Sequence, residues 1–201
     1  MKINTHLTNQ KTISINLEIK DKIIKTLDSA LEQSSRIFIV RIDLRFPLDV
    51  KHKKDSRVIS RLFESLKSKL KTQEKRNKKD KKRIYPNKLK YVWVREVGPL
   101  NKHQHYHCVL FFNKDAFFSI GDFKNTNSLY SMINSAWFSA IGIDKIGMGL
   151  VHYVPFEIKY LNKKDPDFKE KKNKWIDFLT YLAKDFSKPY NDEHRVVGCS
   201  R

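Results

Sequence analysis

Two pairs of residues, far apart in this chain, have the types and spacing that catalysis requires. His105 and His107 stand two residues apart in a strand-like run, and Tyr181 precedes Lys184 by three residues in a helix-like run. Because side chains alternate along a strand, both imidazoles point to one face and can reach one metal ion. Residues three apart on a helix are neighbours, so the ammonium can lie beside the phenol. This combination is typical of a metal site that faces a nucleophile.

A third metal ligand is available across a predicted hairpin. Residues 89–97 and 105–112 are strand-like, and a Gly-Pro-Leu-Asn run between them supplies turn residues. Glu96 lies just before that turn, so strand pairing can place it beside His105 or His107. Two imidazoles and a carboxylate favour Mg²⁺ or Mn²⁺ with open positions for water and a phosphate.

Other interpretations of the histidines stay open. His103 and His105 have the same spacing, although His103 is nearer the turn and the apolar run that follows His107 favours the 105/107 pair. The short motif is also compatible with a polar strand face that only contacts solvent.

Tyr181 lies at the margin of an amphipathic helix. On a helical wheel it falls beside the apolar stripe, with Lys184 on the polar side. The stripe consists of Trp175, Phe178, Leu179, Leu182 and Phe186. The ring can therefore be supported while its oxygen is free. An ordinary phenol pKa of about 10 makes a poor nucleophile, but a metal-bound phosphate and a lysine would favour the phenolate.

Two alternatives to this nucleophile remain. Tyr181 can simply pack at the edge of a core, as tyrosines on amphipathic helices usually do. Tyr160 and Lys163 repeat the same spacing, but they lie between Pro155 and Pro166, where a long helix is not expected.

The charge of the chain points to nucleic acid. Lys and Arg number 41 against 22 Asp and Glu, a formal net charge of +19. Residues 67–90 concentrate this excess, and we expect an exposed basic loop at about 71–88 that contacts the DNA backbone. The expected contact residues are Lys75, Arg76, Lys78, Lys79, Lys81, Lys82 and Arg83.

Membrane and disulfide classes are disfavoured. No apolar stretch reaches the roughly 18 residues that a spanning helix needs, and residues 1–10 lack a signal-peptide pattern. Cys108 and Cys199 form no metal-binding or disulfide pattern. We therefore expect a cytoplasmic protein.

The elements mix without regular strand–helix alternation. Strands are expected at 13–19, 36–46, 89–97, 105–112 and 148–154, and helices from 21, from 55, at 129–140 and at 175–186. This favours an α+β fold with a largely antiparallel central sheet flanked by helices. We expect a flexible arm at 1–11, one domain at 12–188 and a tail at 189–201.

The two motifs together resemble the HUH endonuclease superfamily. The closer resemblance is to the replication-initiator-like proteins of filamentous phages (inoviruses) and related bacterial prophages. The resemblance follows the order of that family's motifs over most of the chain. The segments that carry it are residues 41–47, 91–96, 105–113, 136–137, 149–153 and 181–184.

The resemblance implies a chemistry and a process. His105 and His107 would bind a divalent metal, with Glu96 matching a third polar ligand. Tyr181 would attack a phosphate of single-stranded DNA at a replication origin, keep a 5′-phosphotyrosine link and release a 3′-hydroxyl that primes rolling-circle replication. Lys184 would position the phosphate or metal. A two-tyrosine relay is not expected, and unwinding would fall to a host helicase of the bacterial cell.

Two rival functions share these features. One is a non-catalytic DNA- or RNA-binding regulator on the same fold, and the other is relaxase- or transposase-type use of the same chemistry. The high charge fits them all, and the intact motif residues favour an enzyme.

Overall fold

The computed structural model describes residues 14–48, 55–98, 102–144, 149–191 and 193–200. Its centre is a six-stranded antiparallel sheet in the order β4-β1-β3-β2-β6, with β5 also paired to β1. The strands are β1 Arg36–Arg45, β2 Lys90–Val97, β3 Gln104–Asn113, β4 Val151–Val154, β5 Tyr160–Asn162 and β6 Val197–Cys199. The helices are α1 Leu17–Gln33, α2 Val58–Lys79, α3 Leu129–Ile141 and α4 Phe168–Thr180.

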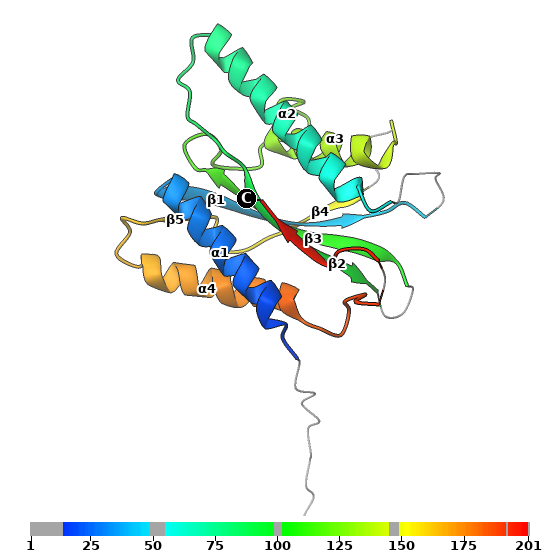
Figure 1. The fold of residues 1–201 in the computed structure, drawn as a ribbon. Helices are drawn as coiled ribbons and strands as arrows, with labels where there is room; N and C mark the ends of the chain where they lie inside the picture. The colour runs from blue at the N-terminus through cyan, green and yellow to red at the C-terminus, as the bar shows by residue number, and fades with distance from the viewer. Residues whose placement is uncertain (1–13, 49–54, 99–101, 145–148, 192, 201) are drawn as a thin grey trace, which may run out of the picture.

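Helices cover both faces of this sheet, so the expected α+β architecture is confirmed. α2 and α3 pack on one face, and α1 and α4 pack on the other (Figure 1). β3 is central, with β1 and β2 as its neighbours. Among the described residues, none of the helices combines the length and hydropathy that crossing a bilayer requires.

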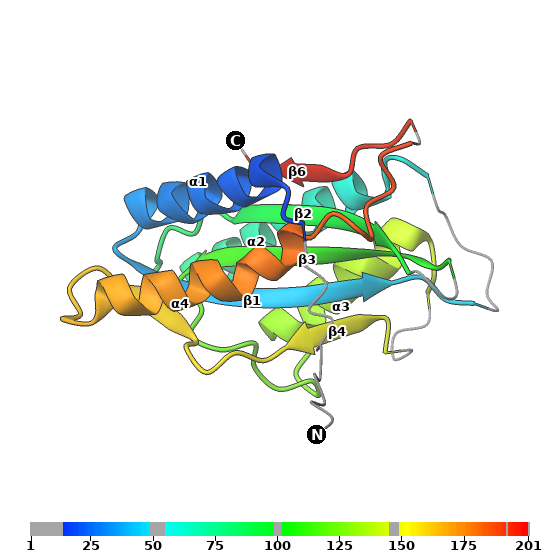
Figure 2. The same cartoon turned by 90° about the horizontal axis from the view of Figure 1, so that it is seen from below.

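The face of β1 under α1 and α4 changes character along the strand. Ile37 and Ile39 are buried in the core on this face, whereas Arg41 and Asp43 follow at the next two positions on the same face. Figure 2 shows the reason, because the carboxyl end of β1 runs beyond the last turn of α4. The polar end of the sheet is therefore only partly covered by helices.

Two expectations about the N-terminal part and the hairpin have different outcomes. The β2–β3 hairpin is confirmed, with Glu96 directly opposite His105. The strand expected at 13–19 is wrong from Leu17 on, because α1 begins there, and before it Ile15 forms only an isolated antiparallel bridge with Lys184. Asn16 accepts a hydrogen bond from the Ile19 amide at 3.0 Å and caps the helix.

The expected basic loop at 71–88 is wrong in its first half. α2 continues to Lys79, well past Leu70, the last buried residue of the helix. This segment contains no glycine or proline and is rich in lysine, glutamate, glutamine and arginine, which favour the helix even without a core to pack on. Residues 82–89 are irregular.

Part of the expected C-terminal tail at 189–201 joins the sheet. Val197–Cys199 form β6, which pairs with β2. A Cβ at Gly198 would lie 2.6 Å from the Trp93 ring, so glycine lets β6 approach β2 this closely. The 1–11 arm lies outside the described residues.

Candidate metal centre and tyrosine site

Glu96, His105 and His107 meet at the polar end of the sheet. The pairing of β2 with β3 places Glu96 opposite His105. His107 lies two residues further along β3, on the same face. Glu96 Oε2 is 3.8 Å from His105 Nε2 and 3.4 Å from His107 Nε2. The possible ligand atoms of the three residues lie within 4.8 Å of one another. The predicted triad is therefore brought together.

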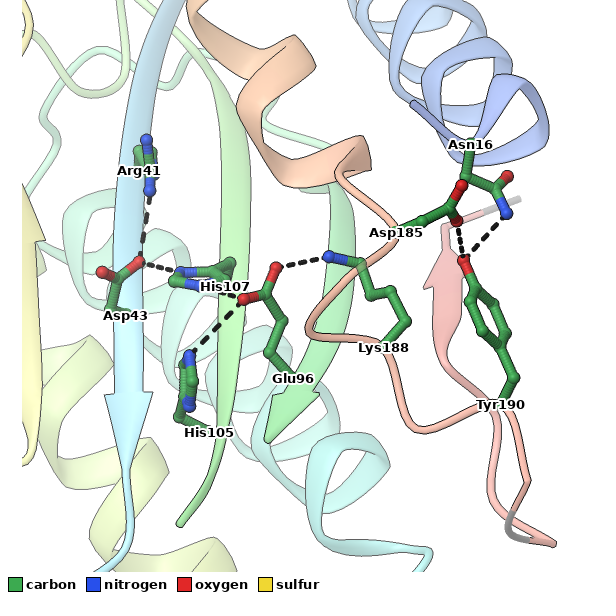
Figure 3. A network of polar contacts seen from close by, with 9 residues as sticks. All are labelled: Asn16, Arg41, Asp43, Glu96, His105, His107, Asp185, Lys188 and Tyr190. Carbon is green, nitrogen blue, oxygen red and sulfur yellow. Dashed lines mark hydrogen bonds and ion pairs between the residues drawn. The ribbon is translucent and has the colours of Figure 1, made fainter. Parts of the chain in front are cut away.

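Asp43 fixes the orientation of His107. It lies opposite His107 in the β1–β3 pairing, and Oδ1 is 2.5 Å from His107 Nδ1 (Figure 3). Burial opposes the charge of Asp43, but the hydrogen bond to His107 lowers the pKa of the carboxyl group. Because a carboxylate accepts here, Nδ1 carries the hydrogen and Nε2 keeps a lone pair for a metal.

Lys188 neutralises Glu96 from the opposite side. Its Nζ forms an ion pair with Glu96 Oε1, and its side chain is 0% exposed. Burial opposes ionisation of Glu96, but His107 and Lys188 lower the pKa of Glu96 to about 2. Oε1 is thus held by the lysine, while Oε2 is the oxygen close to the histidines.

The segment that carries Lys188 is anchored at several points. The amide of Val97 donates to the Ser187 carbonyl at 3.0 Å, next to the lysine. Asp185 accepts hydrogen bonds from the Tyr190 hydroxyl at 2.6 Å and from Ser14 Oγ at 2.9 Å. Figure 3 shows this network running from Tyr190 to Asp185, beside Lys188 and Glu96. The position of the lysine is therefore fixed by the fold.

The donor set fits a divalent cation. Two imidazole nitrogens and one carboxylate oxygen suit Mn²⁺ and related transition metals, and Mg²⁺ tolerates such a set less well because it prefers oxygen. A hollow of about 630 Å³ opens beside the histidines. It is lined by Asp43, Arg45, His103, His105 and His107, among others. Water or a substrate phosphate has room to reach the cluster there.

Tyr181 does not lie within an α-helix as predicted. α4 ends at Thr180, and Tyr181–Ala183 form one turn of 3-10 helix. Positions i and i+3 eclipse in that geometry, and Lys184 Nζ lies 3.5 Å from the Tyr181 ring centroid. The tyrosine is 47% exposed. The predicted pair is thus in contact, at the surface.

A short chain of contacts links Tyr181 to the histidines. The Arg41 guanidinium carbon is 5.4 Å from the Tyr181 ring centroid, and Arg41 Nε is 3.9 Å from Asp43 Oδ1. Asp43 in turn binds His107. The tyrosine and the candidate metal ligands therefore share one face and one end of the sheet.

The alternative residues lie elsewhere. His103 is exposed at the turn and outside the triad, although it lines the same hollow. Tyr160 pairs with Phe38 near the opposite end of β1, five positions from Asp43 and on the α2–α3 face. At about 3.3 Å per residue, this separates them by roughly 17 Å along the strand.

The seven predicted DNA-contact residues are all exposed, and α2 packs on the sheet face opposite the triad. They occupy the end of α2 and the start of the irregular segment after it. A basic cavity of about 540 Å³ beside them is lined by Lys67, Lys71, Lys82, Arg83 and Lys88, among others. It also includes Lys90, at the start of β2, about 20 Å along the strand from Glu96 at about 3.3 Å per residue.

Sequence patterns did not assign Arg41, Asp43 and Lys188. Arg41 and Asp43 did carry a signal, because they are charged positions inside a buried strand. Lys188 carried none, because only the folded C-terminal segment brings it to Glu96.

The fold and site define an α+β protein with a candidate metal cluster on its central sheet. The chain belongs to the YagK/YfjJ C-terminal domain family, whose model matches residues 2–200. It is 36% identical over 194 residues to the uncharacterized protein YfjJ of Escherichia coli K12, covering 90% of this chain and 93% of that protein. It is 35% identical over 195 residues to the uncharacterized protein YagK of the same strain, covering 92% and 93%. No solved structure matches it.

Proposed function

We propose that this protein is a metal-dependent enzyme that nicks and rejoins single-stranded DNA through a tyrosine nucleophile, in the manner of the HUH endonucleases that its motifs resemble. One observation carries the proposal. The triad of Glu96, His105 and His107 and the exposed Tyr181 lie at the same end of one sheet face, linked through Arg41 and Asp43.

The residues divide the reaction between them. Tyr181 attacks the phosphorus of a DNA phosphodiester, and the bond to the 3′ oxygen breaks. The phenolic proton is lost to water, the 3′ oxygen takes up a proton, and the 5′ phosphate stays on the tyrosine. A Mg²⁺ or Mn²⁺ ion held by Glu96, His105 and His107 would polarise the phosphate when bound. Rejoining is the same exchange in reverse.

Lys184 supports the nucleophile electrostatically. Its ammonium lies against the Tyr181 ring, so its positive charge favours the phenolate and the charge that develops on the phosphate. Asp43 holds His107 in position through a hydrogen bond, and Lys188 holds Glu96 through an ion pair. The chain thus supplies charge and geometry around one reacting phosphate.

The biological process follows from this chemistry. A nick that leaves a free 3′-hydroxyl provides a primer, so we propose initiation of rolling-circle replication of a phage or mobile element in the bacterial cytoplasm. A host helicase would unwind the duplex. The basic surface at the end of α2 would bind the DNA backbone without reading its sequence.

Covalent capture tests this proposal. Purified protein is mixed with labelled single-stranded oligonucleotides that carry origin-like sequences, in Mn²⁺, Mg²⁺ or EDTA, and separated on a denaturing gel. We expect an adduct that requires the metal, with the DNA on residue 181 by peptide mass spectrometry. Tight binding without an adduct, with both metals and many sequences, would favour the non-catalytic regulator.

A further inference from the structure

Arg41 is a buried cation next to the candidate active site. It lies on β1, two positions before Asp43 and on the same face of the sheet. The residue is only 7% exposed, although arginine is rarely buried this far unless it is paired. A buried arginine therefore requires neighbouring groups that compensate its positive charge.

The described residues compensate this charge poorly. The carboxylate of Asp43 is 3.9 Å from Arg41 Nε, beyond hydrogen-bonding distance, and the same Oδ1 is already bound at 2.5 Å by His107. Within the part of the chain that is described, Arg41 Nε is buried without a hydrogen-bond partner. Asp43 thus compensates the buried charge only through a long ion pair, and Nε keeps unused capacity to donate to an anion.

Two aromatic rings hold the guanidinium in place. Its central carbon is 5.1 Å from the Phe178 ring centroid and 5.4 Å from the Tyr181 ring centroid. Contacts of this kind attract a cation but leave its in-plane donors free. The guanidinium is therefore oriented beside the candidate nucleophile, between it and Asp43.

We propose that Arg41 forms a phosphate subsite that binds a non-bridging oxygen of the scissile phosphodiester while Tyr181 attacks. The inference rests on the proposed function, because it assigns that reaction a further catalytic residue. A guanidinium suits this task, since its planar donors match phosphate oxygens and it remains charged at neutral pH. Arg41 and the metal ion would then both stabilise the negative charge that develops on the phosphate.

A double-mutant cycle tests this subsite by combining one substitution in the protein with one modification of the DNA. The rate of adduct formation is measured in single turnover for wild type and Arg41→Met, on a phosphodiester and on a methylphosphonate at the scissile position. Arg41→Met should slow the phosphodiester reaction by about 100-fold or more, as removal of one donor to a developing charge does. On the neutral methylphosphonate the same variant should cost less than tenfold, because the anion that Arg41 binds is absent.

Controls separate this role from a structural one. Arg36→Met, at the other end of β1, should react like wild type. Arg41→Met should keep its Mn²⁺ affinity and be at least as stable as wild type, because a poorly paired buried charge is replaced by an apolar side chain. Arg41→Lys keeps the charge without the planar fork and should recover only part of the rate. It also provides the test if Arg41→Met does not fold.

The outcomes are distinct. An equal loss of rate on both DNAs, or a wild-type rate for Arg41→Met, would overturn the phosphate subsite and leave the proposed nicking function standing. Absence of any adduct in wild type would overturn the nicking function, and the subsite with it.

Discussion

The carboxylate of Asp43 and the imidazole of His107 form a 2.5 Å hydrogen bond across the β1–β3 pairing. The bond places the hydrogen on Nδ1 and leaves the lone pair of Nε2, 3.4 Å from Glu96 Oε2, available for a metal ion. A carboxylate behind a histidine ligand both orients the ring and raises its basicity. Asp43 is therefore a positioning residue for the candidate metal centre.

Asp43→Ala should weaken Mn²⁺ binding by about 10- to 100-fold, the usual effect of removing such a partner. Isothermal titration calorimetry measures this affinity. Asp115→Ala is the matched control, because Asp115 pairs with Arg36 at the other end of β1, away from the triad. Equal affinities for wild type and Asp43→Ala would contradict the positioning role.

Lys188→Met should destabilise the metal-free protein by up to about 3 kcal/mol, because it leaves Glu96 buried without its lysine partner. A divalent cation would supply the missing positive charge. Saturating Mn²⁺ should therefore raise the melting temperature of the variant more than that of wild type. Differential scanning calorimetry with Mn²⁺ or EDTA measures both shifts, and a smaller metal effect in the variant would argue against Glu96 as a ligand.

Much of the triad could be predicted because its geometry is local. Glu96 and His105 belong to one hairpin with a short turn, so strand periodicity alone placed them side by side. The Tyr181 and Lys184 contact is likewise set by a spacing of three. The actual turn is a 3-10 helix, a local change at the helix end that the apolar stripe does not encode.

The parts that could not be predicted depend on long-range packing. Lys188 reaches Glu96 across 92 positions in the sequence, and β6 pairs with β2 because the C-terminal segment folds back. Neither contact has a periodic pattern. The predicted end of α2 is wrong for another reason, because the apolar stripe ends at Leu70 but the helix continues to Lys79. Helix propensity was sufficient to continue it.

The basic end of α2 should contribute affinity for DNA and not the chemical step. Replacing Lys75, Arg76, Lys78 and Lys79 with glutamine should flatten the salt dependence of single-stranded DNA binding by about 0.7 log–log unit for each phosphate that the protein no longer neutralises. The matched control replaces four lysines of α4, namely Lys169, Lys171, Lys172 and Lys174. Fluorescence anisotropy across a salt series measures both, and identical slopes for the two variants would contradict a specific DNA contact by α2.

The Asp185–Tyr190 contact should stabilise the segment that carries Lys188 in a pH-dependent way. Burial and the hydrogen bond to Asp185 raise the pKa of Tyr190 to about 12. Because the folded value is above the unfolded value of about 10, the stabilisation is complete below pH 10 and declines as pH rises towards 12. Wild type should exceed Tyr190→Phe by about 1 kcal/mol in urea unfolding at pH 8, and the difference should shrink at pH 11. A constant difference would contradict this account.

The most direct test of the central claim is adduct formation by Tyr181→Phe. The variant loses only a hydroxyl group, so stability, Mn²⁺ affinity and single-stranded DNA binding should match wild type. Tyr160→Phe is the matched control, since Tyr160 is similarly exposed and has a lysine at the same spacing, but lies at the other end of β1. On a denaturing gel with labelled oligonucleotide and Mn²⁺, we predict no adduct for Tyr181→Phe and a normal yield for Tyr160→Phe. A normal adduct yield from Tyr181→Phe would contradict the assignment of the nucleophile.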